Sequence, residues 1–555
     1  MARKSSRKPV SRPVRSTKQV NGNGHLHLYE FLPIRPWVKD SLAAGQKAGA
    51  GTGDRHGRIL IVPTSAQPGV DAGAGGNAGF HAPKAGAQSW LAGHLEGVPS
   101  WQRESALKTL PESVLLADDE GPIWVLMPRG NGISSQDGAF SPSHYGRARD
   151  LVGACVNGFR DYKLERVTVA GFGCSREHWL GALTGLDLGA YRFVQANQNG
   201  AAACKLPVLS LPVDVAKDHS LIAEASAIAL SVNTARHLVN LPANSLNPAT
   251  YSTIVSGIFK GSRTTSVRVL DSAGLAKEGM NLMLAVGGAS RNPPCLVHIR
   301  YRPHVSMRAK SSRAPIAFVG KGVTFDTGGL DIKPSSGMRW MKKDMGGSAT
   351  TVGLALYTEL MQTDRPYDFY LAIAENAVSS GAMRPGDVFR ARNSMTVEIH
   401  NTDAEGRLVM ADAFDYALTR SGSDEPSMLV DTSTLTGAMR VAVGLTISGM
   451  FSTHDHLAEA CIVAGQQAGD PCWRLPLFDE YKSALKSHAA DLSNCSDSAF
   501  GGAITAALFL EKFTRGKPWV HFDYYAWTDR ASGAMTEPGG NGQALQLLIR
   551  LLPNL

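Results

Sequence analysis

A continuous apolar run that ends in glycines and a lysine limits the folds open to this chain. The run occupies residues 316–322 and reads IAFVGKG. Strands that are buried on both faces have unbroken apolar sequences of this kind, and they occur mainly in parallel sheets covered by helices. The run therefore predicts an α/β fold in which Lys321 stands at the carboxyl end of a buried strand.

A lysine between glycines also occurs in phosphate-binding loops. The Walker pattern requires glycine five residues before the glycine of the Gly-Lys pair, and serine or threonine after the lysine. Pro315 and Gly322 occupy those two positions, so the run is not a Walker loop.

A second informative segment is residues 401–408, which read NTDAEGRL. Residues 395–399 before it alternate like a strand, and residues 408–418 after it have helical periodicity. Asp403 and Glu405 are expected on one face of extended chain, about 6–7 Å apart by the rise of a strand. Such a pair suits a metal site. The alternative is a solvated turn whose surface ion pairs contribute little.

Further charged residues follow the apolar run in glycine-rich segments. Asp326 precedes Thr327-Gly328-Gly329, Lys333 follows, and Asp344 lies next to Met345-Gly346-Gly347. Glycines let backbone and ligand approach closely. A single buried charge is usually a paired core residue, but this group, together with residues 401–408, indicates a site.

These segments resemble the signature segments of the leucyl aminopeptidase family, the di-metal cytosolic aminopeptidases. The resemblance covers roughly residues 217–555, and the NTDAEGRL octet is highly specific to the family. Residues 26–210 are only loosely similar to the family's variable N-terminal domain. The matching segments are residues 319–350, 374–376, 384–388, 401–418, 434–438, 501–507 and 519–523.

The resemblance implies a metallo-exopeptidase that releases N-terminal residues, preferably leucine-like ones, from peptide substrates. It implies one metal ion held by Lys321, Asp326, Asp344 and Glu405. A second ion would be held by Asp326, Glu405 and Asp403, the last through its side chain and its backbone carbonyl. An oxygen-rich set with one amine allows Zn²⁺ or Mn²⁺, and Mg²⁺ also fits.

The same resemblance implies roles for two cations outside this ligand set. Lys333 would polarise the scissile carbonyl. Arg407 would hold a bicarbonate ion that carries the proton, aided by backbone N–H groups near Gly406 and Leu408, because an arginine with a pKa above ~12 cannot itself act as a base. The alternative for Arg407 is an ion pair with a carboxylate of the octet.

Met341, Thr434 and Gly437 match family positions that line the pocket for the first substrate residue. Methionine is a flexible apolar residue that accepts leucine-like side chains without strict selection. Two segments depart from the family pattern. Residues 524–528 read YYAWT where the family has a small Ala-Gly-Thr segment, and residues 531–540 form a longer turn region. Both departures bear on the pocket width and on subunit packing.

The first 20 of the 555 residues hold seven Lys and Arg residues and no acid, whereas the whole chain has a net charge of +8. The remainder is therefore nearly neutral, and residues 1–25 are expected to form a disordered tail. Such a tail could contact nucleic acid electrostatically or act as an organelle transit peptide. Seven scattered cysteines favour a reducing compartment, so we expect a cytoplasmic protein. No apolar run is long enough to cross a membrane.

The order of predicted elements indicates two α/β parts. Strands at 59–62, 123–127 and 167–170 alternate with helical stretches, which predicts a smaller N-terminal α/β domain over residues 26–210. A long helix within residues 211–245 is expected to end near Pro242 and to connect this domain to a catalytic α/β domain. That domain would span residues 246–555 and contain a mixed sheet flanked by helices.

The family resemblance further implies a homohexamer. A second functional hypothesis is a nucleic-acid-binding or structural protein on the same scaffold. The intact set of acidic residues argues against a purely structural role, because buried like charges are costly to keep together.

Overall fold

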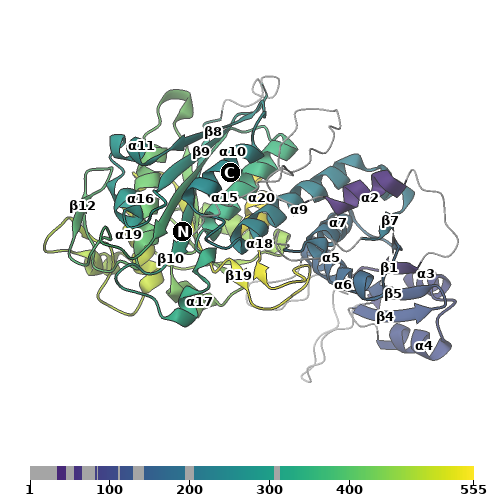
Figure 1. Cartoon of the computed structure of the whole chain (residues 1–555). Coiled ribbons are helices and arrows are strands. Elements are labelled where there is room, and N and C mark those ends of the chain that lie inside the picture. Colours follow the sequence, from purple (N-terminus) through teal and green to yellow (C-terminus); the bar gives the residue numbers. More distant parts are fainter. Residues whose placement is uncertain are drawn as a thin grey trace, which may run out of the picture.

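The computed structural model describes most of the chain, and the elements below lie within these residues. They are residues 34, 36–45, 55–65, 82–83, 86–109, 113–128, 143–193, 206–304 and 313–555. The predicted basic tail, residues 1–25, lies outside them. Figure 1 shows two α/β parts: a larger body and a smaller part built from the N-terminal third of the chain.

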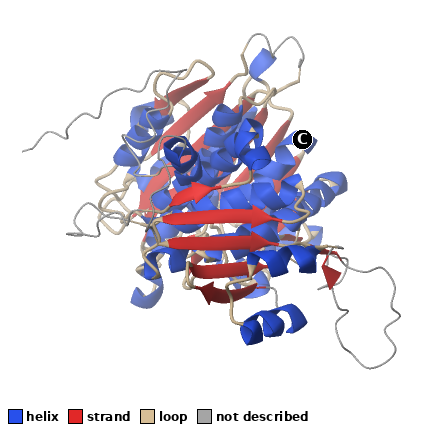
Figure 2. Ribbon diagram, turned by 90° about the vertical axis from the view of Figure 1, so that its right-hand side faces the viewer, coloured by secondary structure: helices blue, strands red, loops and turns tan. Residues whose placement is uncertain are grey.

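The smaller part is built on a five-stranded sheet with the order β4-β5-β1-β6-β7, which faces the viewer in Figure 2. Neighbouring strands are parallel except β4 and β5. The strands predicted at 59–62, 123–127 and 167–170 are confirmed as β1, β5 and β6. The bounds are β1 (His56–Ile61), β4 (Ser113–Asp118), β5 (Gly121–Leu126), β6 (Arg166–Gly171) and β7 (Val208–Ser210).

The larger part contains an eight-stranded mixed sheet with the order β16-β15-β18-β14-β10-β11-β9-β8. Its four central strands, β18, β14, β10 and β11, are parallel. The bounds are β8 (Thr265–Leu270), β9 (Cys295–Tyr301), β10 (Ile316–Asp326), β11 (Tyr367–Asn376), β14 (Met428–Ser433), β15 (Ser448–Ser452), β16 (Cys472–Arg474) and β18 (Trp519–Asp523). The predicted fold class, α/β with a mixed sheet flanked by helices, is confirmed.

Smaller sheets complete the strand structure. A three-stranded sheet has the order β12-β13-β17, and two pairs stand apart, β19 with β20 and β2 with β3. The bounds are β2 (Thr64–Ser65), β3 (Ala82–Pro83), β12 (Val388–Arg390), β13 (Thr396–Glu398), β17 (Leu492–Ser493), β19 (Trp527–Thr528) and β20 (Gly539–Gly540).

Helices cover both large sheets. In the smaller part they are α2 (Trp37–Gly45), α3 (Ala87–His94), α4 (Ser100–Thr109), α5 (His144–Ala154), α6 (Val156–Asp161) and α7 (Arg176–Ala190). The connecting region has α8 (Val213–Lys217) and α9 (His219–Asn240). The larger part has α10 (Pro248–Ile258), α11 (Ser272–Lys277), α12 (Asn281–Gly287), α14 (Ser335–Met338), α15 (Gly346–Met361), α16 (Glu405–Leu418), α17 (Gly437–Val443), α18 (Asp455–Ala468), α19 (Gly502–Glu511) and α20 (Leu545–Leu551).

The long helix α9 lies between the two parts. Asp218 begins it by accepting a hydrogen bond from the Leu221 N–H, and the chain leaves the helix just before Pro242. The helix is almost entirely buried and packs against α7 of the smaller part and α15 of the larger one. The predicted helix is thus confirmed, whereas the domain boundaries at residues 210 and 245 remain predictions.

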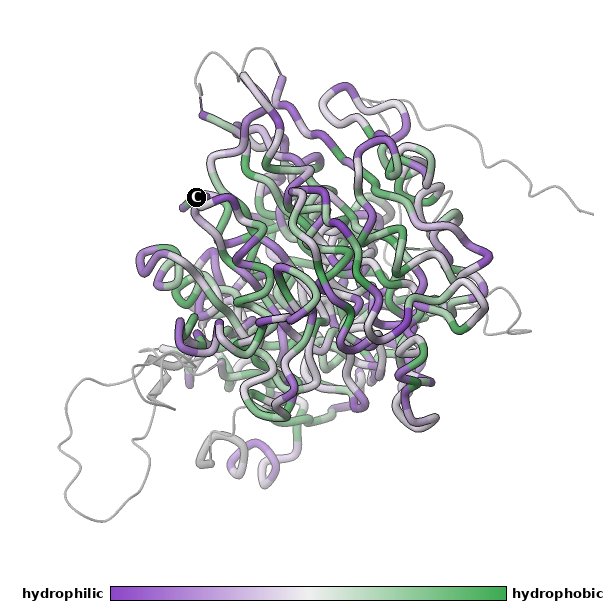
Figure 3. The backbone as a smooth tube through the Cα atoms, turned by 90° about the vertical axis from the view of Figure 1, so that its left-hand side faces the viewer, coloured by the Kyte–Doolittle hydropathy of each residue, from purple (hydrophilic) through white to green (hydrophobic). Residues whose placement is uncertain are grey.

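Alternate residues of β10 enter two separate cores. Ile316 and Phe318 belong to the core that includes α9 and α15, whereas Ala317 and Val319 belong to the core that includes α16. This is the side-chain period of a strand with both faces covered. In Figure 3, the apolar segments of the backbone are accordingly concentrated inside the molecule, and the polar turns lie mostly at its surface.

Helix α15 approaches the central strands so closely that side chains are excluded. A Cβ on Gly347 would lie 2.1 Å from the Thr432 carbonyl oxygen of β14, and one on Gly320 would lie 2.5 Å from the Cα of Ser348. The glycines therefore fix the start of α15 against the sheet. Asp344 lies two residues before that helix, so the close packing of the helix start also fixes the position of Asp344 beside the sheet.

Six of the seven cysteines fall within the described residues, and none of those six forms a disulfide. Among the helices of the described stretches, none has both the length and the apolar character needed to cross a bilayer.

Asp187 in α7 gives a test of the packing of the smaller part. It is buried and accepts the Val38 N–H, but its Oδ2 atom has no hydrogen-bond partner. Burial raises its pKa from 3.8 to about 7. Because the folded state holds this proton more tightly than the unfolded state, the carboxyl group reduces stability as the pH rises from 3.8 to about 7.

We expect Asp187→Asn to raise the free energy of unfolding at pH 8 by about 2 kcal/mol, after allowing for an imperfectly bonded amide. At pH 5 the gain should be smaller, since the wild-type carboxyl group is then mostly protonated. Melting temperatures at both pH values measure the difference. Asp161→Asn, at an exposed position of the same part, is the control and should change neither value. An equal gain at both pH values would show that the charge is not the cause.

Candidate metal centre

A cavity of about 320 Å³ lies at the carboxyl ends of the central parallel strands. Strand β10 ends there at Asp326, and the segments that follow β14 and β18 supply Thr434 and Tyr524 to the same wall. Ligand sites of open α/β sheets are characteristically found at this edge. The wall is rich in charge, with five cationic and four acidic side chains.

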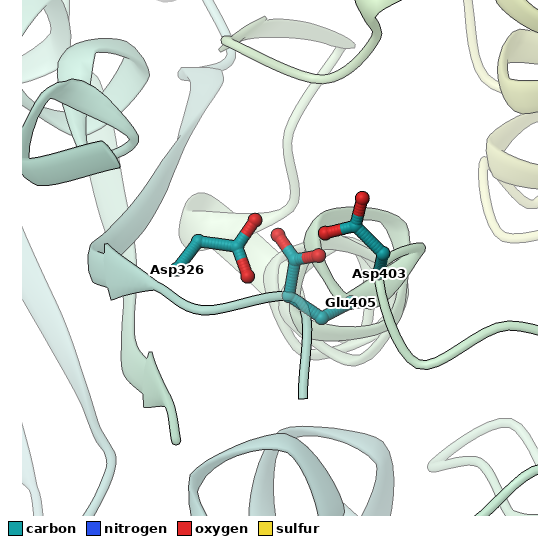
Figure 4. A group of neighbouring side chains, drawn as sticks. All are labelled: Asp326, Asp403 and Glu405. Atoms are coloured by element: carbon teal, nitrogen blue, oxygen red, sulfur yellow. The ribbon is translucent and has the colours of Figure 1, made fainter. Parts of the chain in front are cut away.

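Three carboxylates converge in this cavity, as Figure 4 shows. Asp326, Asp403 and Glu405 each offer an oxygen, and the three oxygens lie within 4.8 Å of one another. Asp326 is the last residue of β10 and Glu405 is the first residue of α16. Asp403 lies in a turn just before α16, not in extended chain as predicted. The strand before it, β13, belongs to the small sheet and ends earlier, at Glu398.

The turn at residues 401–404 has a simple physical cause. The Asn401 side chain accepts a hydrogen bond from the Asp403 N–H at 2.7 Å, which closes an Asx turn. Asp331 accepts a bond from the Thr402 N–H at 2.7 Å, and Thr402 donates to the Gly328 carbonyl at 2.7 Å. These local side-chain bonds compete successfully with an extended backbone. They also join this turn to the segment that follows β10.

Asp326 is oriented by groups on two sides. Its Oδ1 atom accepts hydrogen bonds from the Gly328 N–H at 2.8 Å and from the Asn376 side chain at 2.9 Å. Asn376 also donates to the Thr402 carbonyl at 3.1 Å, so it connects the two carboxylate segments. Sequence reasoning assigned Asn376 no role, although it ends one of the family-like segments and could have been found there.

Lys321 lies beside two of the acids. Its Nζ atom is 2.8 Å from Asp344 Oδ2 and 2.9 Å from Glu405 Oε1. The residue lies in the middle of β10 and not at its carboxyl end, because the strand continues to Asp326. Burial opposes its charge, but the carboxylates of Asp344 and Glu405 raise the pKa of Lys321 above its ordinary value. A cation bound here would have to displace that proton.

The acids have the properties of metal ligands. One oxygen on each of Asp344, Asp403 and Glu405 is buried and has only a lysine ammonium beside it, Lys321 for Asp344 and Glu405 and Lys333 for Asp403, so two lysines face these acids together with Asp326. Burial and the neighbouring Asp326 raise the pKa of Glu405 to about 8 and that of Asp403 to about 6. Buried like charges without sufficient compensation favour divalent cations, so the donor set fits a metal centre.

Lys333 is the cation nearest to Asp326 and Asp403. Its Nζ atom lies 2.8 Å from Asp326 Oδ2 and also contacts Asp403 Oδ1. Burial opposes its charge, but Asp326 raises the pKa of Lys333 above its ordinary value. Its ammonium group neutralises Asp326 and Asp403, two of the acids that the resemblance assigns to the second metal ion. With 17% of its side chain exposed, Lys333 reaches the solvent side of the cavity.

Arg407 follows the acids on α16. Its Nη1 atom donates to the Asn494 carbonyl at 2.7 Å, and its Nε atom is buried without a partner. Among the described residues it has no ion pair with Asp403 or Glu405, so that alternative is not what the structure contains. Burial lowers the pKa of Arg407 from its ordinary value. The unbonded edge of the guanidinium fits a small planar oxyanion.

The predicted pocket residues Met341, Thr434 and Gly437 all line the cavity. Thr434 also donates to Asp344 Oδ1 at 2.8 Å, so it orients an acid as well. Gly406 and Leu408 do not line it. Leu408 is the fourth residue of α16 and is wholly buried. The backbone N–H groups near Gly406 and Leu408 therefore remain predicted partners of an anion beside Arg407.

Lys343, Arg440 and Tyr525 are among the residues of the wall to which sequence reasoning assigned no role. Tyr525 belongs to the segment that departs from the family pattern, so that departure does reach the cavity. The next residue, Ala526, has a φ of 59°, a left-handed conformation that costs a non-glycine residue about 1–2 kcal/mol. The contribution of Tyr525 to the wall could have been found from the sequence, because the segment YYAWT is bulky where the family has small residues.

Gly406 allows a direct test of how Lys321 is held. A Cβ at this position would lie 2.5 Å from both Cε and Nζ of Lys321. We expect Gly406→Ala to push the amine away from the acids and to lower the affinity for Mn²⁺ by ~10–100-fold, the range found when groups that orient ligands are lost. Isothermal titration with Mn²⁺ measures the affinity. Gly337→Ala is the control, because nothing lies within 4 Å of a Cβ there. Equal affinities in the two variants would refute the proposed place of Lys321.

Sequence comparisons agree on the family to which this region is similar. The catalytic domain of the cytosol aminopeptidase family matches residues 233–549. A probable cytosol aminopeptidase of Haemophilus ducreyi is 42% identical over 330 residues, which are 60% of this chain and 64% of the relative. One from a Bradyrhizobium species is 38% identical over 375 residues, 66% of this chain and 72% of the relative. The match thus spans slightly less than two thirds of the length of the first of these relatives.

Solved structures are similar over nearly the whole chain. The bottromycin maturation enzyme BotP, in complex with Mn, has a TM-score of 0.73 and 28% identity, covering 90% of this chain and 99% of BotP. The cytosol aminopeptidase from Coxiella burnetii has a TM-score of 0.69 and 29% identity, covering 91% of this chain and 98% of that one.

Proposed function

Because the chain belongs to the cytosol aminopeptidase family, we propose that it is a metal-dependent aminopeptidase that releases N-terminal residues from peptides. The observation that carries the proposal is the acidic cluster of the buried Asp326 and Glu405 with the partly exposed Asp403, whose oxygens lie within 4.8 Å of one another. Lys321 and Asp344 adjoin it. A structural protein has no physical need for such a costly arrangement.

The proposed ligands divide between two divalent cations. Lys321, Asp326, Asp344 and Glu405 would hold one, and Asp326, Asp403 and Glu405 the other. Such ions, when bound, lower the pKa of a water molecule and so supply a hydroxide nucleophile near neutral pH. Zn²⁺ and Mn²⁺ suit this donor set, and Mg²⁺ also fits. BotP, a structural neighbour, was solved with Mn, which supports Mn²⁺ as the first ion to test.

Lys333 would stabilise the oxyanion that develops on the scissile carbonyl. In its present position it neutralises Asp326 and Asp403. With cations bound to these acids, charge repulsion would displace the ammonium group of Lys333 toward the cavity. The side chain is already partly exposed on that side. A positive group placed where negative charge develops typically contributes about 3–4 kcal/mol to catalysis.

Arg407 would hold a bicarbonate ion beside the reacting groups. Its buried Nε atom has no partner, and a planar guanidinium matches a planar oxyanion with two parallel hydrogen bonds. An ion held there by Arg407 would supply a group that can accept and donate a proton beside the reacting groups. The backbone N–H groups at the start of α16 add favourable partial charge.

Substrate selection would come from the rest of the wall. Met341 offers a flexible apolar surface, and Gly437 leaves open space, since nothing lies within 4 Å of a Cβ there. We propose that leucine-like first residues are accepted broadly. The free α-amine of a peptide would bind one of the two metal ions held by the acids, which accounts for release of N-terminal residues only. The family resemblance also supports a homohexamer.

The test compares two substrates that differ only at the amine. After addition of Mn²⁺ or Zn²⁺, we expect rapid hydrolysis of leucine p-nitroanilide and a rate lower by more than ~100-fold for its N-acetyl derivative. Release of nitroaniline is followed by absorbance. Equal rates on the two substrates would show that the protein is not an exopeptidase, and no hydrolysis of either with any tested metal would refute the proposed function.

A further inference from the structure

Lys343 is a buried cation of the cavity wall that has no anionic partner. Only 4% of the residue is exposed, and among the described residues its ammonium forms neither an ion pair nor a hydrogen bond. Buried ammonium groups are almost always paired, because desolvation of an isolated charge is costly. An unpaired one that lines a cavity therefore indicates a ligand that brings the missing negative charge.

Asp344 and Asp523, the carboxylates that act electrostatically on Lys343, are engaged elsewhere. Asp344, the next residue, is 2.8 Å from Lys321 and accepts a hydrogen bond from Thr434. Asp523 accepts hydrogen bonds from the Leu435 and Thr436 N–H groups and from the Thr436 hydroxyl. Lys343 is thus close to negative charge but is not neutralised by it.

Arg440 brings a second cation to the same part of the wall. It lies three residues after Gly437 on α17, and residues three apart share a face of a helix. Its guanidinium carbon is 5.0 Å from the centre of the Tyr525 ring, and Lys343 Nζ is 4.4 Å from the same centre. Arg440 is exposed and has no ion pair among the described residues.

Tyr525 organises the two cations without neutralising them. A ring face attracts cations by its quadrupole, but the ring carries no net charge. Two positive groups gathered on one aromatic ring repel each other, and a carboxylate beside them would relieve that repulsion. The five cations of the wall also outnumber its four acids, all of which already lie beside Lys321 or Lys333.

We propose that Lys343, Arg440 and Tyr525 form an anion-binding wall, and that the protein prefers peptides whose first residue is glutamate or aspartate. This inference rests on the proposed aminopeptidase function and on the pocket assigned to Met341. The apolar stem of a glutamate side chain would contact the methionine, and its carboxylate would accept charge-assisted hydrogen bonds from Lys343 and Arg440. A leucine-like residue occupies the same space without those bonds.

The experiment compares substrates that have the same shape but a different charge. The dipeptide amides Glu-Ala-NH₂ and Gln-Ala-NH₂ test the first residue, and Leu-Glu-NH₂ and Leu-Gln-NH₂ test the second. All carry an amidated carboxyl terminus, so the side chain is the source of the negative charge. We expect kcat/KM with Mn²⁺ to be about tenfold higher for Glu-Ala-NH₂ than for Gln-Ala-NH₂, the value of one charge-assisted hydrogen bond.

Three variants assign the preference to residues. Lys343→Met should reduce the Glu/Gln ratio at least fivefold, and Arg440→Met, at an exposed helical position that tolerates substitution, should reduce it in the same direction. Arg339→Met removes an exposed cation of the same region that does not line the cavity, and it should leave the ratio unchanged. A binding readout accompanies the kinetics: L-glutamate should raise the melting temperature of the wild type more than L-glutamine does.

The outcomes separate this inference from the proposed function. Hydrolysis of Leu-Gln-NH₂ with a Glu/Gln ratio at or below one would overturn the inference and leave the aminopeptidase intact. A charge preference confined to the second residue would also overturn it. A ratio that is high in the wild type but unchanged by both Lys343→Met and Arg440→Met would refute the assignment to this wall. No hydrolysis of any peptide would refute both.

Discussion

Glu405→Gln is expected to reduce the bound metal from two ions to at most one per chain and to lower kcat/KM by more than ~10³-fold. Loss of a group that only orients a ligand costs ~10–100-fold, so loss of a bridging ligand must cost more. Glutamine has the same shape but offers one neutral oxygen. Glu405 is 1% exposed, and its Oε1 atom lies 2.9 Å from Lys321 Nζ. Metal content by mass spectrometry and initial rates on leucine p-nitroanilide give the two readouts.

The control for this substitution is Glu425→Gln, which removes an exposed carboxylate that pairs with Lys517 far from the cavity. It should bind two ions and retain wild-type rates. The melting temperature of metal-free Glu405→Gln should not fall, because the substitution removes a buried like charge beside Asp326. A Glu405→Gln protein that still binds two ions and hydrolyses the substrate normally would contradict the bridging role.

Lys333→Met is expected to lower kcat/KM by ~10²–10³-fold while two metal ions remain bound. This is the loss measured when one donor that stabilises a developing oxyanion is removed. The methionine retains most of the apolar stem and loses the charge. Steady-state kinetics and metal analysis on the same sample separate catalysis from metal binding, and Lys486→Met, at an exposed position, serves as the matched control.

The structure contains a competing role for Lys333 that this variant distinguishes. Its ammonium lies between Asp326 and Asp403, where it could act only as an internal counter-ion. In that case Lys333→Met would bind Mn²⁺ more tightly and would lose less than about fivefold in kcat/KM. That result would remove Lys333 from the catalytic assignment.

Much of the larger fold follows from local sequence. The buried strand at residues 316–322 and the helix ending before Pro242 were both predicted, because their apolar patterns and end signals act within a few residues. The extent of β10 was not, since beyond Lys321 the strand continues through residues 322–326, in which glycine, threonine and aspartate interrupt the apolar run. Its partner β11 pairs with that stretch as far as Asp326, whereas β14 pairs only with residues 316–320, and a pairing between strands far apart in sequence cannot be read from one strand alone.

In the candidate site, too, some features could be predicted from local sequence and others could not. The acids were predicted by residue type and by family resemblance, but residues 401–404 were expected to be extended. They form a turn because Asn401 accepts the Asp403 N–H within the segment and Asp331 accepts the Thr402 N–H. The second of these bonds depends on a partner from another segment, which the local sequence does not reveal. The same applies to the wall of Lys343, Arg440 and Tyr525. These residues come from three separate segments, and their convergence is a property of the sheet edge.

A metal titration tests the central claim most directly. The purified protein is treated with a chelator, dialysed, and titrated with Mn²⁺ while hydrolysis of leucine p-nitroanilide is followed. The two-metal account predicts loss of activity on chelation and a return that saturates at two equivalents per chain. Activity that survives complete metal removal, or the absence of activity with Mn²⁺, Zn²⁺ and Mg²⁺ alike, would contradict it.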